Sequence, residues 1–128
     1  MSKLLLDSDV LIDLLRGRPA TREFLLAATQ DSVPCCSAIS VAEVHTGMRP
    51  DESEATNALL DGLVILPVTR AVAELAGRFK RRDRGRTLEL AHCLIAATAA
   101  LEGATLATGN VRDYPMPEIT LLRARRER

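Results

Sequence analysis

The sequence predicts a single α/β domain with a parallel central sheet of about five strands flanked by helices. Two observations lead to this fold class. Short apolar runs alternate along the 128 residues with longer stretches that carry apolar residues at helical spacing. Strands that alternate with long helices favour parallel pairing through right-handed crossovers. No linker or repeat divides the chain, so we expect one domain over 1–128, with 122–128 as a basic tail.

The first half of the chain shows the alternation clearly. Ser8 can cap the first helix, and Gly17 followed by Pro19 ends it. Ser40 opens a later helix with Glu43 three residues on, which is the spacing of a capping box. The expected strands here are 3–7, 33–36 and 63–67, and the expected helices are 9–16, 20–29, one from 40 onward, and 51–60.

The second half contains the two longest helices. Residues 69–82 carry Val72, Leu75 and Phe79 at helical spacing. Residues 88–101 are rich in alanine and stop before Gly103. The expected strands that follow are 105–107, short enough for a central strand, and 119–121, an edge strand.

Composition excludes several classes of protein. With 47% hydrophobic residues the chain is globular, and its apolar runs are far shorter than the roughly 20 residues of a membrane span. The first apolar run lasts three residues before Asp7, which indicates a strand and not a signal peptide. Three cysteines without CxxC spacing (Cys35, Cys36, Cys93) indicate reduced, buried thiols of a cytoplasmic protein. Three aromatic residues are too few for a base-stacking surface.

The net charge of zero conceals a strong local bias. Seventeen basic residues balance 17 acidic ones, yet 78–86 has a net charge of +5 and 123–128 of +3, which leaves −8 for the rest. Fifteen of the basic residues are arginine, which favours bidentate phosphate recognition. The alternative to phosphate contact is that the basic residues of 78–86 form a solvated helix face. The candidate phosphate contacts are Arg78, Arg81, Arg82, Arg84 and Arg86.

Acidic residues follow several of the expected strands. Asp7 ends the first strand, Glu43 lies half a turn into the helix after the second, and Asn110 and Asp113 follow the fourth. In an open parallel sheet, ligands bind beyond the carboxyl ends of the strands. Carboxylates that converge there need a divalent cation, Mg²⁺ or Mn²⁺, which can activate water and hold a phosphodiester oxygen. Each acid alone also fits a helix cap, so the interpretation depends on their combination.

Four segments of this chain form a familiar pattern. They are 4–13 (LLLDSDVLID), 40–44 (SVAEV) with Gly47, 93–99 (CLIAATA) and 106–114 (LATGNVRDY). These segments resemble the PIN-domain ribonucleases, and more closely the VapC toxins of bacterial VapBC toxin–antitoxin pairs. The resemblance spans nearly the whole chain in the order and spacing of that family.

The resemblance implies a compact PIN-like α/β fold with an acidic Mg²⁺ or Mn²⁺ centre that hydrolyses RNA. Asp7 and Glu43 match the first two metal-binding acids, and Asp113 matches the acid of the last motif. The supporting residues are Ser8, which matches a hydroxyl residue that helps to hold the metal-bound water, together with Asp9 and Asn110.

The resemblance also implies partners. The substrate is expected to be tRNA or another structured RNA. A VapB-type antitoxin would wrap the toxin with a C-terminal peptide, for which the helix that carries Leu11, Leu14 and Leu15 could supply an apolar groove, although such leucines also suit a core. A homodimer is expected, with higher assembly through the antitoxin, which alone would contact operator DNA.

His92 departs from the family pattern. Similar toxins have an aspartate two positions ahead of the leucine at 94, and imidazole is a poor Mg²⁺ ligand but a reasonable one for Mn²⁺. His92 can ligate a softer ion, or Glu89, one helical turn earlier, can replace the missing acid. The site can instead be impaired, by drift or by an introduced change, or His92 can be a half-buried structural residue.

The resemblance, together with the acids beyond the strands, therefore implies a toxin that is a metal-dependent endoribonuclease. The alternative is a catalytically impaired PIN domain that still binds antitoxin or RNA. Haloacid dehalogenase-like phosphatases share an Asp-x-Asp start but need a downstream lysine, and the only later lysine is Lys80, within the basic run. A receiver domain would need an acid where Leu66 to Thr69 stand, and neither histidine has a nucleophile elbow near it.

Overall fold

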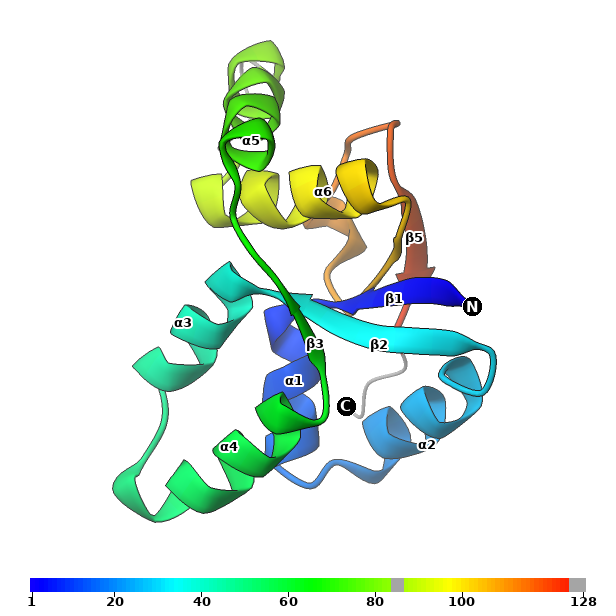
Figure 1. Ribbon diagram of the computed structural model, residues 1–128, viewed down its shortest axis with the longest axis vertical. Helices are drawn as coiled ribbons and strands as arrows, with labels where there is room; N and C mark the ends of the chain where they lie inside the picture. Colours follow the sequence, from blue (N-terminus) through cyan, green and yellow to red (C-terminus); the bar gives the residue numbers. More distant parts are fainter. Residues whose placement is uncertain (84–86, 125–128) are drawn as a thin grey trace.

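Five parallel strands form the centre of the structure, a computed structural model that describes residues 1–83 and 87–124 (Figure 1). Their order across the sheet is β3-β2-β1-β4-β5, so β1 is central and pairs with both β2 and β4. The strands are β1 Ser2–Leu6, β2 Ser32–Ser37, β3 Val64–Leu66, β4 Thr105–Thr108 and β5 Thr120–Arg123. The parallel α/β sheet predicted from the sequence is confirmed.

Helices cover both faces of the sheet. In Figure 1, α1, α2 and α4 lie on one side, and α5 and α6 lie together on the other. The helices are α1 Ser8–Leu15, α2 Pro19–Ala28, α3 Ala38–Thr46, α4 Ser53–Asp61, α5 Arg70–Arg82 and α6 Leu90–Glu102. Two short 3₁₀ segments complete the described chain, η1 Pro50–Glu52 and η2 Val111–Asp113. Gly103 ends α6 with a φ of 62°, the left-handed conformation that a glycine adopts without steric cost.

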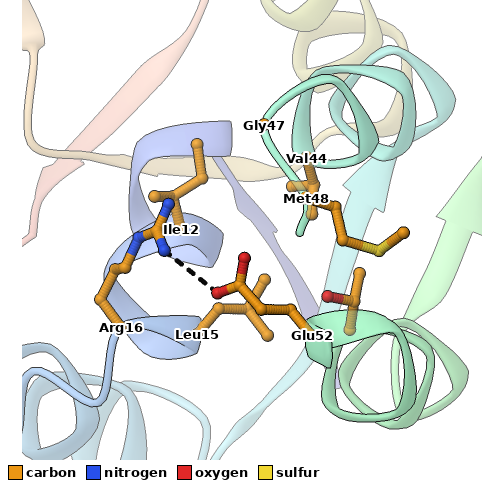
Figure 2. A pocket seen from close by; sticks show the side chains of 8 residues that line it. Ile12, Leu15, Arg16, Val44, Gly47, Met48 and Glu52 are labelled. Atoms are coloured by element: carbon orange, nitrogen blue, oxygen red, sulfur yellow. Dashed lines mark hydrogen bonds and ion pairs between the residues drawn. The ribbon is translucent and has the colours of Figure 1, made fainter. Parts of the chain in front are cut away.

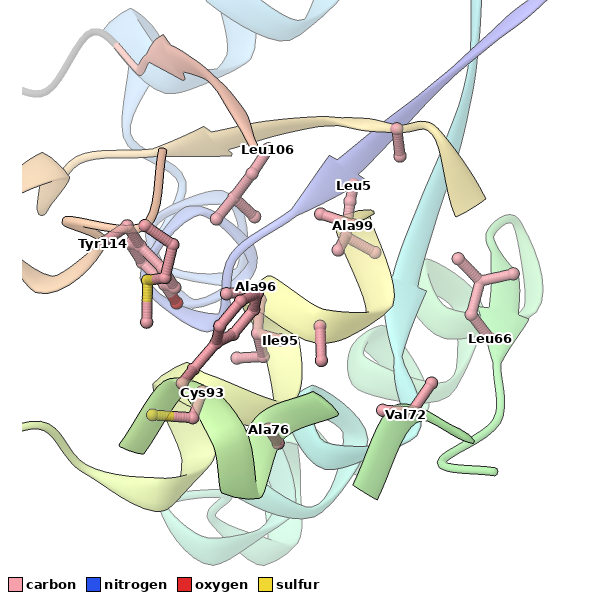
Figure 3. Packing of buried hydrophobic residues seen from close by; sticks show 14 of the residues in the cluster. Leu5, Leu66, Val72, Ala76, Cys93, Ile95, Ala96, Ala99, Leu106 and Tyr114 are labelled. Carbon is pink, nitrogen blue, oxygen red and sulfur yellow. The ribbon is translucent and has the colours of Figure 1, made fainter. Parts of the chain in front are cut away.

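Alternating side chains of β1 build two separate cores. Leu5 faces α5 and α6 and packs in a buried cluster with Leu106 of β4 and Phe79 of α5 (Figure 3). Leu4 and Leu6 point the other way and pack with the residues of α1 and α2. Because successive strand residues point to opposite faces, the unbroken leucine run suits a strand that is buried on both sides.

Two helices begin earlier than their sequence signals suggest, α1 by one residue and α3 by three. The N-cap of α1 is Asp7 and not Ser8, because the Asp7 carboxylate accepts from the backbone N–H of Ser8. The N-cap of α3 is Ser37, whose hydroxyl accepts from the N–H of Ile39. The capping box expected between Ser40 and Glu43 is therefore wrong, since both residues lie inside α3 with their side chains directed elsewhere.

Other boundaries differ by one or two residues, for local reasons. The last long helix begins at Leu90 and not at residue 88, because Glu89 has the extended backbone of an N-cap residue. The expected helix 51–60 opens as the 3₁₀ segment η1, with Pro50 at its first position, before α4. Leu122 and Arg123 belong to β5, so they are strand residues and not the start of a tail.

The cysteines behave as the sequence predicts. Cys35, Cys36 and Cys93 are buried free thiols, and burial raises the pKa of Cys36 to about 11. These thiols are therefore protonated, unreactive core residues near neutral pH. Within the described part of the chain, no helix has the length and apolar character that crossing a bilayer requires.

The buried position of Leu106 leads to a stability prediction. Leu106→Ala should lower the free energy of unfolding by about 2–5 kcal/mol, because it opens a cavity between the sheet and α6. Leu26→Ala, at a site that is 62% exposed, should change it by less than about 0.5 kcal/mol. Urea unfolding followed by circular dichroism measures both, and similar losses for the two variants would contradict this packing.

Candidate active site at the switch point of the sheet

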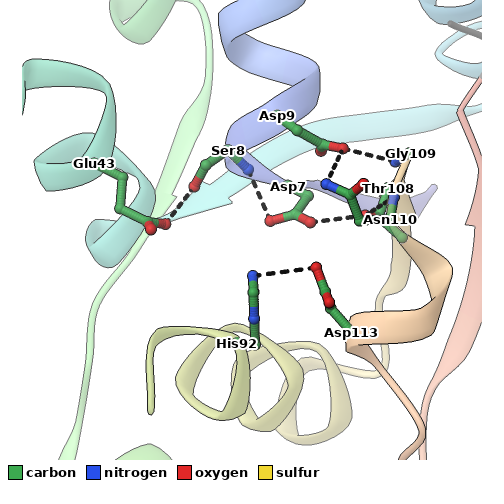
Figure 4. A network of polar contacts seen from close by, with 9 residues as sticks. All are labelled: Asp7, Ser8, Asp9, Glu43, His92, Thr108, Gly109, Asn110 and Asp113. Atoms are coloured by element: carbon green, nitrogen blue, oxygen red, sulfur yellow. Dashed lines mark hydrogen bonds and ion pairs between the residues drawn. The ribbon is translucent and has the colours of Figure 1, made fainter. Parts of the chain in front are cut away.

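The strand order reverses between β1 and β4, and this reversal creates a crevice. From β1 the chain first builds β2 and β3 on one side, then returns to build β4 and β5 on the other. In open α/β sheets ligands bind at such a switch point, beyond the carboxyl ends of the strands. Asp7 follows β1, and Gly109 and Asn110 follow β4, so polar groups converge at this crevice (Figure 4).

Asp7 is the most firmly held residue of the site. It is 3% exposed, and its backbone N–H extends the β1–β4 pairing by donating to the carbonyl of Ala107 at 2.9 Å. Its Oδ1 accepts from the N–H of Ser8 at 2.8 Å, and its Oδ2 accepts from the hydroxyl of Thr108 at 2.7 Å. These donors keep a buried carboxylate in one orientation.

Ser8 connects the first acid to the second. Its hydroxyl lies 2.6 Å from Glu43 Oε1 and 2.9 Å from the hydroxyl of the fully buried Ser40. Glu43 is half-buried on α3 and is held toward α1 by this contact. Asp7, Ser8 and Glu43 therefore form one hydrogen-bonded chain, as their predicted roles at a common site require.

Asp9 ties the segment after β4 to α1. Its Oδ2 accepts from the N–H of Gly109 at 3.0 Å and from the side-chain amide of Asn110 at 3.1 Å. We expected Asn110 to be a polar support of the site, without naming its partner. Its side chain instead bonds Asp9, and only its backbone carbonyl accepts from the N–H of Asp113.

His92 faces Asp113 across the crevice from the other acids. Its Nε2 lies 3.7 Å from Asp113 Oδ2, a distance at which a protonated imidazole forms an ion pair. His92 occupies the first turn of α6, and the side chain of Asp113 on η2 is 42% exposed. Glu89, considered as a substitute acid, is the exposed N-cap residue of α6 and lies outside the helix that carries His92.

Tyr114 completes the wall of the site. It is 2% exposed, and its ring contacts that of His92 edge to face, with centroids 5.2 Å apart and an interplanar angle of 70°. Burial raises the pKa of Tyr114 strongly, and the negative charge of Asp7 raises it further, so the hydroxyl keeps its proton.

Comparison with known protein families shows which family the chain belongs to. Residues 4–114 match the family model described as the PIN domain. The chain belongs to the PIN-domain family. It is 41% identical over 117 residues to Ribonuclease VapC10 of Mycobacterium tuberculosis, which covers 90% of this chain and 88% of that protein. It is 35% identical over 115 residues to Ribonuclease VapC19 of the same species, which covers 88% and 92% respectively.

Solved structures share the fold of this PIN domain. A toxin–antitoxin complex from Klebsiella pneumoniae has a TM-score of 0.82 and 26% identity, covering 96% of this chain and 98% of the other. DNA-bound VapBC from Salmonella typhimurium has a TM-score of 0.80 at 22% identity, covering 95% and 98%. The impaired alternative gains no support from these relatives, since the two curated proteins are named as ribonucleases.

The PIN centre offers metal ligands of the right kind in two separate pairs. One pair is Asp7 and Glu43, joined through Ser8, and the other is His92 and Asp113. Within residues 1–83 and 87–124, no three His, Cys, Asp or Glu side chains are gathered closely enough to form a metal-binding group. The donor types suit Mg²⁺ at the carboxylates and a transition ion such as Mn²⁺ at the imidazole.

Among the described residues, only part of the basic cluster on α5 is free of ion pairs and could contact phosphate. Arg78 and Arg81 are exposed, whereas Arg82 forms a bidentate ion pair with Glu118, at 2.5 and 2.9 Å, and lies 5.2 Å above the Phe79 ring. The pairing raises the pKa of Arg82 and lowers that of Glu118. The remaining two candidates, Arg84 and Arg86, lie outside the described residues.

The leucines of α1 divide between core and groove. Leu11 is fully buried, so it belongs to the core. Leu14 and Leu15 line a cavity of about 360 Å³ between α1, α2 and α4. Leu15 also lines a smaller hollow of about 40 Å³ beside Met48 (Figure 2). The ion pair between Arg16 and Glu52 lies at the edge of this hollow.

Three residues of the site were not predicted from the sequence to belong to it. Thr108 and Tyr114 lie within the last family-like segment, and Ser40 opens the second. For Thr108 a signal existed, because it ends a central strand directly beside the one that Asp7 follows. The inward direction of Ser40 and of the Tyr114 hydroxyl depends on tertiary packing that no local pattern reveals.

The double role of Thr108 leads to a second prediction. Its hydroxyl donates to Asp7 and accepts from the N–H of Asn110 at 3.0 Å. Thr108→Val should therefore lower the free energy of unfolding by about 1–3 kcal/mol, because a buried carboxylate loses a donor. Thr98→Val is the matched control, since that hydroxyl bonds the carbonyl of Leu94 within α6. Urea unfolding at neutral pH should show a smaller loss for the control, and equal losses would contradict the assignment.

Proposed function

We propose that this chain is the toxin of a type II toxin–antitoxin pair and that it is a metal-dependent endoribonuclease. The observation that carries the proposal is the buried Asp7 carboxylate at the switch point, linked through Ser8 to Glu43 and facing His92 and Asp113. The curated relatives named as ribonucleases support the same activity.

The metal ligands that we propose are Asp7, Glu43, His92 and Asp113. A divalent cation held there would lower the pKa of a bound water and neutralise charge on a phosphodiester. Asp7 would hold the cation with an orientation that Ser8 and Thr108 already set. The Ser8 hydroxyl orients Glu43, and Asp9 holds the segment at Gly109 and Asn110 in place.

RNA is the proposed substrate, of a structured type such as tRNA. Arg78 and Arg81 are exposed on α5 and supply positive charge for phosphate contact. Arg82 adds to this charge only at the expense of its pair with Glu118. We therefore assign the phosphate contact first to Arg78 and Arg81.

A VapB-type antitoxin is the proposed partner, in the cytoplasm. The structures of similar fold include toxin–antitoxin complexes, some of them bound to DNA. The cavity at Leu14 and Leu15 suits apolar anchors of a peptide, and the acidic centre suits a basic side chain. We propose a homodimer that contacts operator DNA only through the antitoxin.

The central role of Asp7 is tested by RNA cleavage. Purified protein, dialysed against a chelator and resupplied with Mn²⁺ or Mg²⁺, should cleave a labelled structured RNA. Asp7→Asn should reduce the rate by about a hundredfold or more, because even a group that only supports a metal ligand contributes ten- to a hundredfold. Asp31→Asn, at an exposed turn, is the control and should cleave normally. Metal binding by the wild-type protein without cleavage would contradict the proposal and favour a binding-only PIN domain.

His92 should determine the metal preference. His92→Asp should raise the Mg²⁺-dependent cleavage rate by about tenfold, the scale of one additional charge–charge contact in a partly hydrated site, and Mn²⁺-dependent cleavage less. It should also strengthen growth arrest on expression. The matched control is His45→Asp on α3, whose imidazole is exposed. Equal rates for wild type and His92→Asp in Mg²⁺ would show that the imidazole does not limit magnesium use.

A further inference from the structure

A positively charged hollow lies between the end of α5 and the turn before β5. Its volume is about 280 Å³, and none of the proposed metal ligands lines it. Among the described residues that line it, three cations face one anion. It lies on the α5 side of the sheet, away from α1, α2 and α4 (Figure 1). The residues that line this α5 hollow are Leu75, Arg78, Phe79, Arg81, Arg82 and Glu118.

Arg82 is held in the α5 hollow by one fixed contact and one exchangeable contact. The fixed contact is the Phe79 ring, which is 1% exposed and lies 5.2 Å from the guanidinium carbon. The exchangeable contact is the bidentate ion pair with Glu118, whose side chain is 40% exposed. Because exposed ion pairs contribute little to stability, another anion can replace the carboxylate while the ring keeps Arg82 in place.

The Glu118 carboxylate lies where a phosphate would bind. A guanidinium binds two oxygens of a carboxylate or of a phosphate in the same bidentate geometry. The chain that leads to Glu118 is restrained, because Met116 is buried and the ring of Pro117 fixes its backbone φ angle. Rotation of the Glu118 side chain is therefore enough to release Arg82.

The spacing of the arginines suits a nucleic-acid strand. Arg78 and Arg82 are one helical turn apart, about 6 Å along the axis of α5. This rise is close to the distance between successive phosphates of such a strand. The α5 hollow is also near the proposed centre, since Asp113 and Glu118 are five residues apart and their Cα atoms are separated by at most about 18 Å. A few nucleotides span this distance.

The geometry therefore points to an exchange of anions at Arg82. Resting on the function proposed above, we propose that the α5 hollow is a phosphate subsite for RNA, in which a phosphodiester displaces Glu118 from Arg82. Arg78 and Arg81, which are exposed, attract the strand. The Arg82–Glu118 pair competes with the strand and lowers its affinity.

Removal of the competing carboxylate tests this exchange. Glu118→Gln should raise the affinity for a labelled structured RNA by about three- to fivefold, the scale of one exposed ion pair that no longer has to break. Glu74→Gln is the matched control, because it removes the same charge and the Arg70–Glu74 pair from the same helix, outside the hollow. It should change the affinity by less than about twofold. Fluorescence anisotropy in excess chelator measures binding without cleavage.

A double-mutant cycle separates the exchange from a general effect of charge. In an Arg82→Gln background, Glu118→Gln should change the RNA affinity by less than about twofold, because Arg82 is no longer there to be released. Both side chains are largely exposed, so each variant should fold, which circular dichroism checks. Inorganic phosphate should displace RNA from the wild-type protein no better than chloride does at the same ionic strength.

The outcomes separate this inference from the proposed function. Equal affinities of Glu118→Gln and Glu74→Gln, or an undiminished gain in the Arg82→Gln background, would show that the pair only tethers the turn to α5 and would overturn the subsite. Stronger displacement by inorganic phosphate than by chloride would assign the hollow to free anions and not to RNA. The expected affinities without metal-dependent cleavage would overturn the ribonuclease proposal alone. Absence of RNA binding in every variant would overturn this inference together with the proposed substrate.

Discussion

The carboxylate of Asp7, held between the first turn of α1 and the end of β4, is the interaction on which the rest of the site depends. One of its oxygens begins a helix by accepting from Ser8, and the other accepts from Thr108 of the neighbouring strand. Hydrogen bonds to a buried charge contribute about 1.5–3 kcal/mol each, and a buried charge without them is strongly unfavourable. The pairing of β1 with β4, the start of α1 and the orientation of the Asp7 carboxylate therefore depend on one another.

The site has a buried half and an exposed half. Asp7, Ser8 and Thr108 are buried, and both Ser8 and Thr108 donate to the Asp7 carboxylate, so their positions are set by the fold. The side chain of Asp113 is 42% exposed on a three-residue 3₁₀ segment, and its contact with His92 is long. Groups of the first kind are preorganised, while groups of the second kind can adapt to what enters the crevice.

Much of this structure could be predicted from residues alone. The alternation of apolar runs with helical stretches predicted the parallel sheet, and the family-like segments contain the acids that lie in two separate pairs beyond the carboxyl ends of its strands. The incorrect predictions concern side chains that can bond either a nearby residue or one that is distant in the chain. Ser40 and Glu43 have the spacing of a capping box, yet both instead contact the hydroxyl of Ser8, which is 32 and 35 residues away in the chain. A sequence pattern shows only the hydrogen-bond partners that are near in the chain. Tertiary packing decides whether a side chain bonds one of these or a distant residue.

The fold also determines when the site can exist. Asp7 and Thr108 are separated by 101 residues, and β1 gains its second neighbour only when β4 is added. A ribosome that has made every element before β4 has made Asp7, Ser8 and Glu43, but not the strand that bonds Asp7 through Ala107 and Thr108. Contacts so distant in sequence slow folding, because closing a long loop costs entropy before the contact is gained. A growing chain therefore carries its acids without a finished centre, and assembly of the centre waits until β4 has been made.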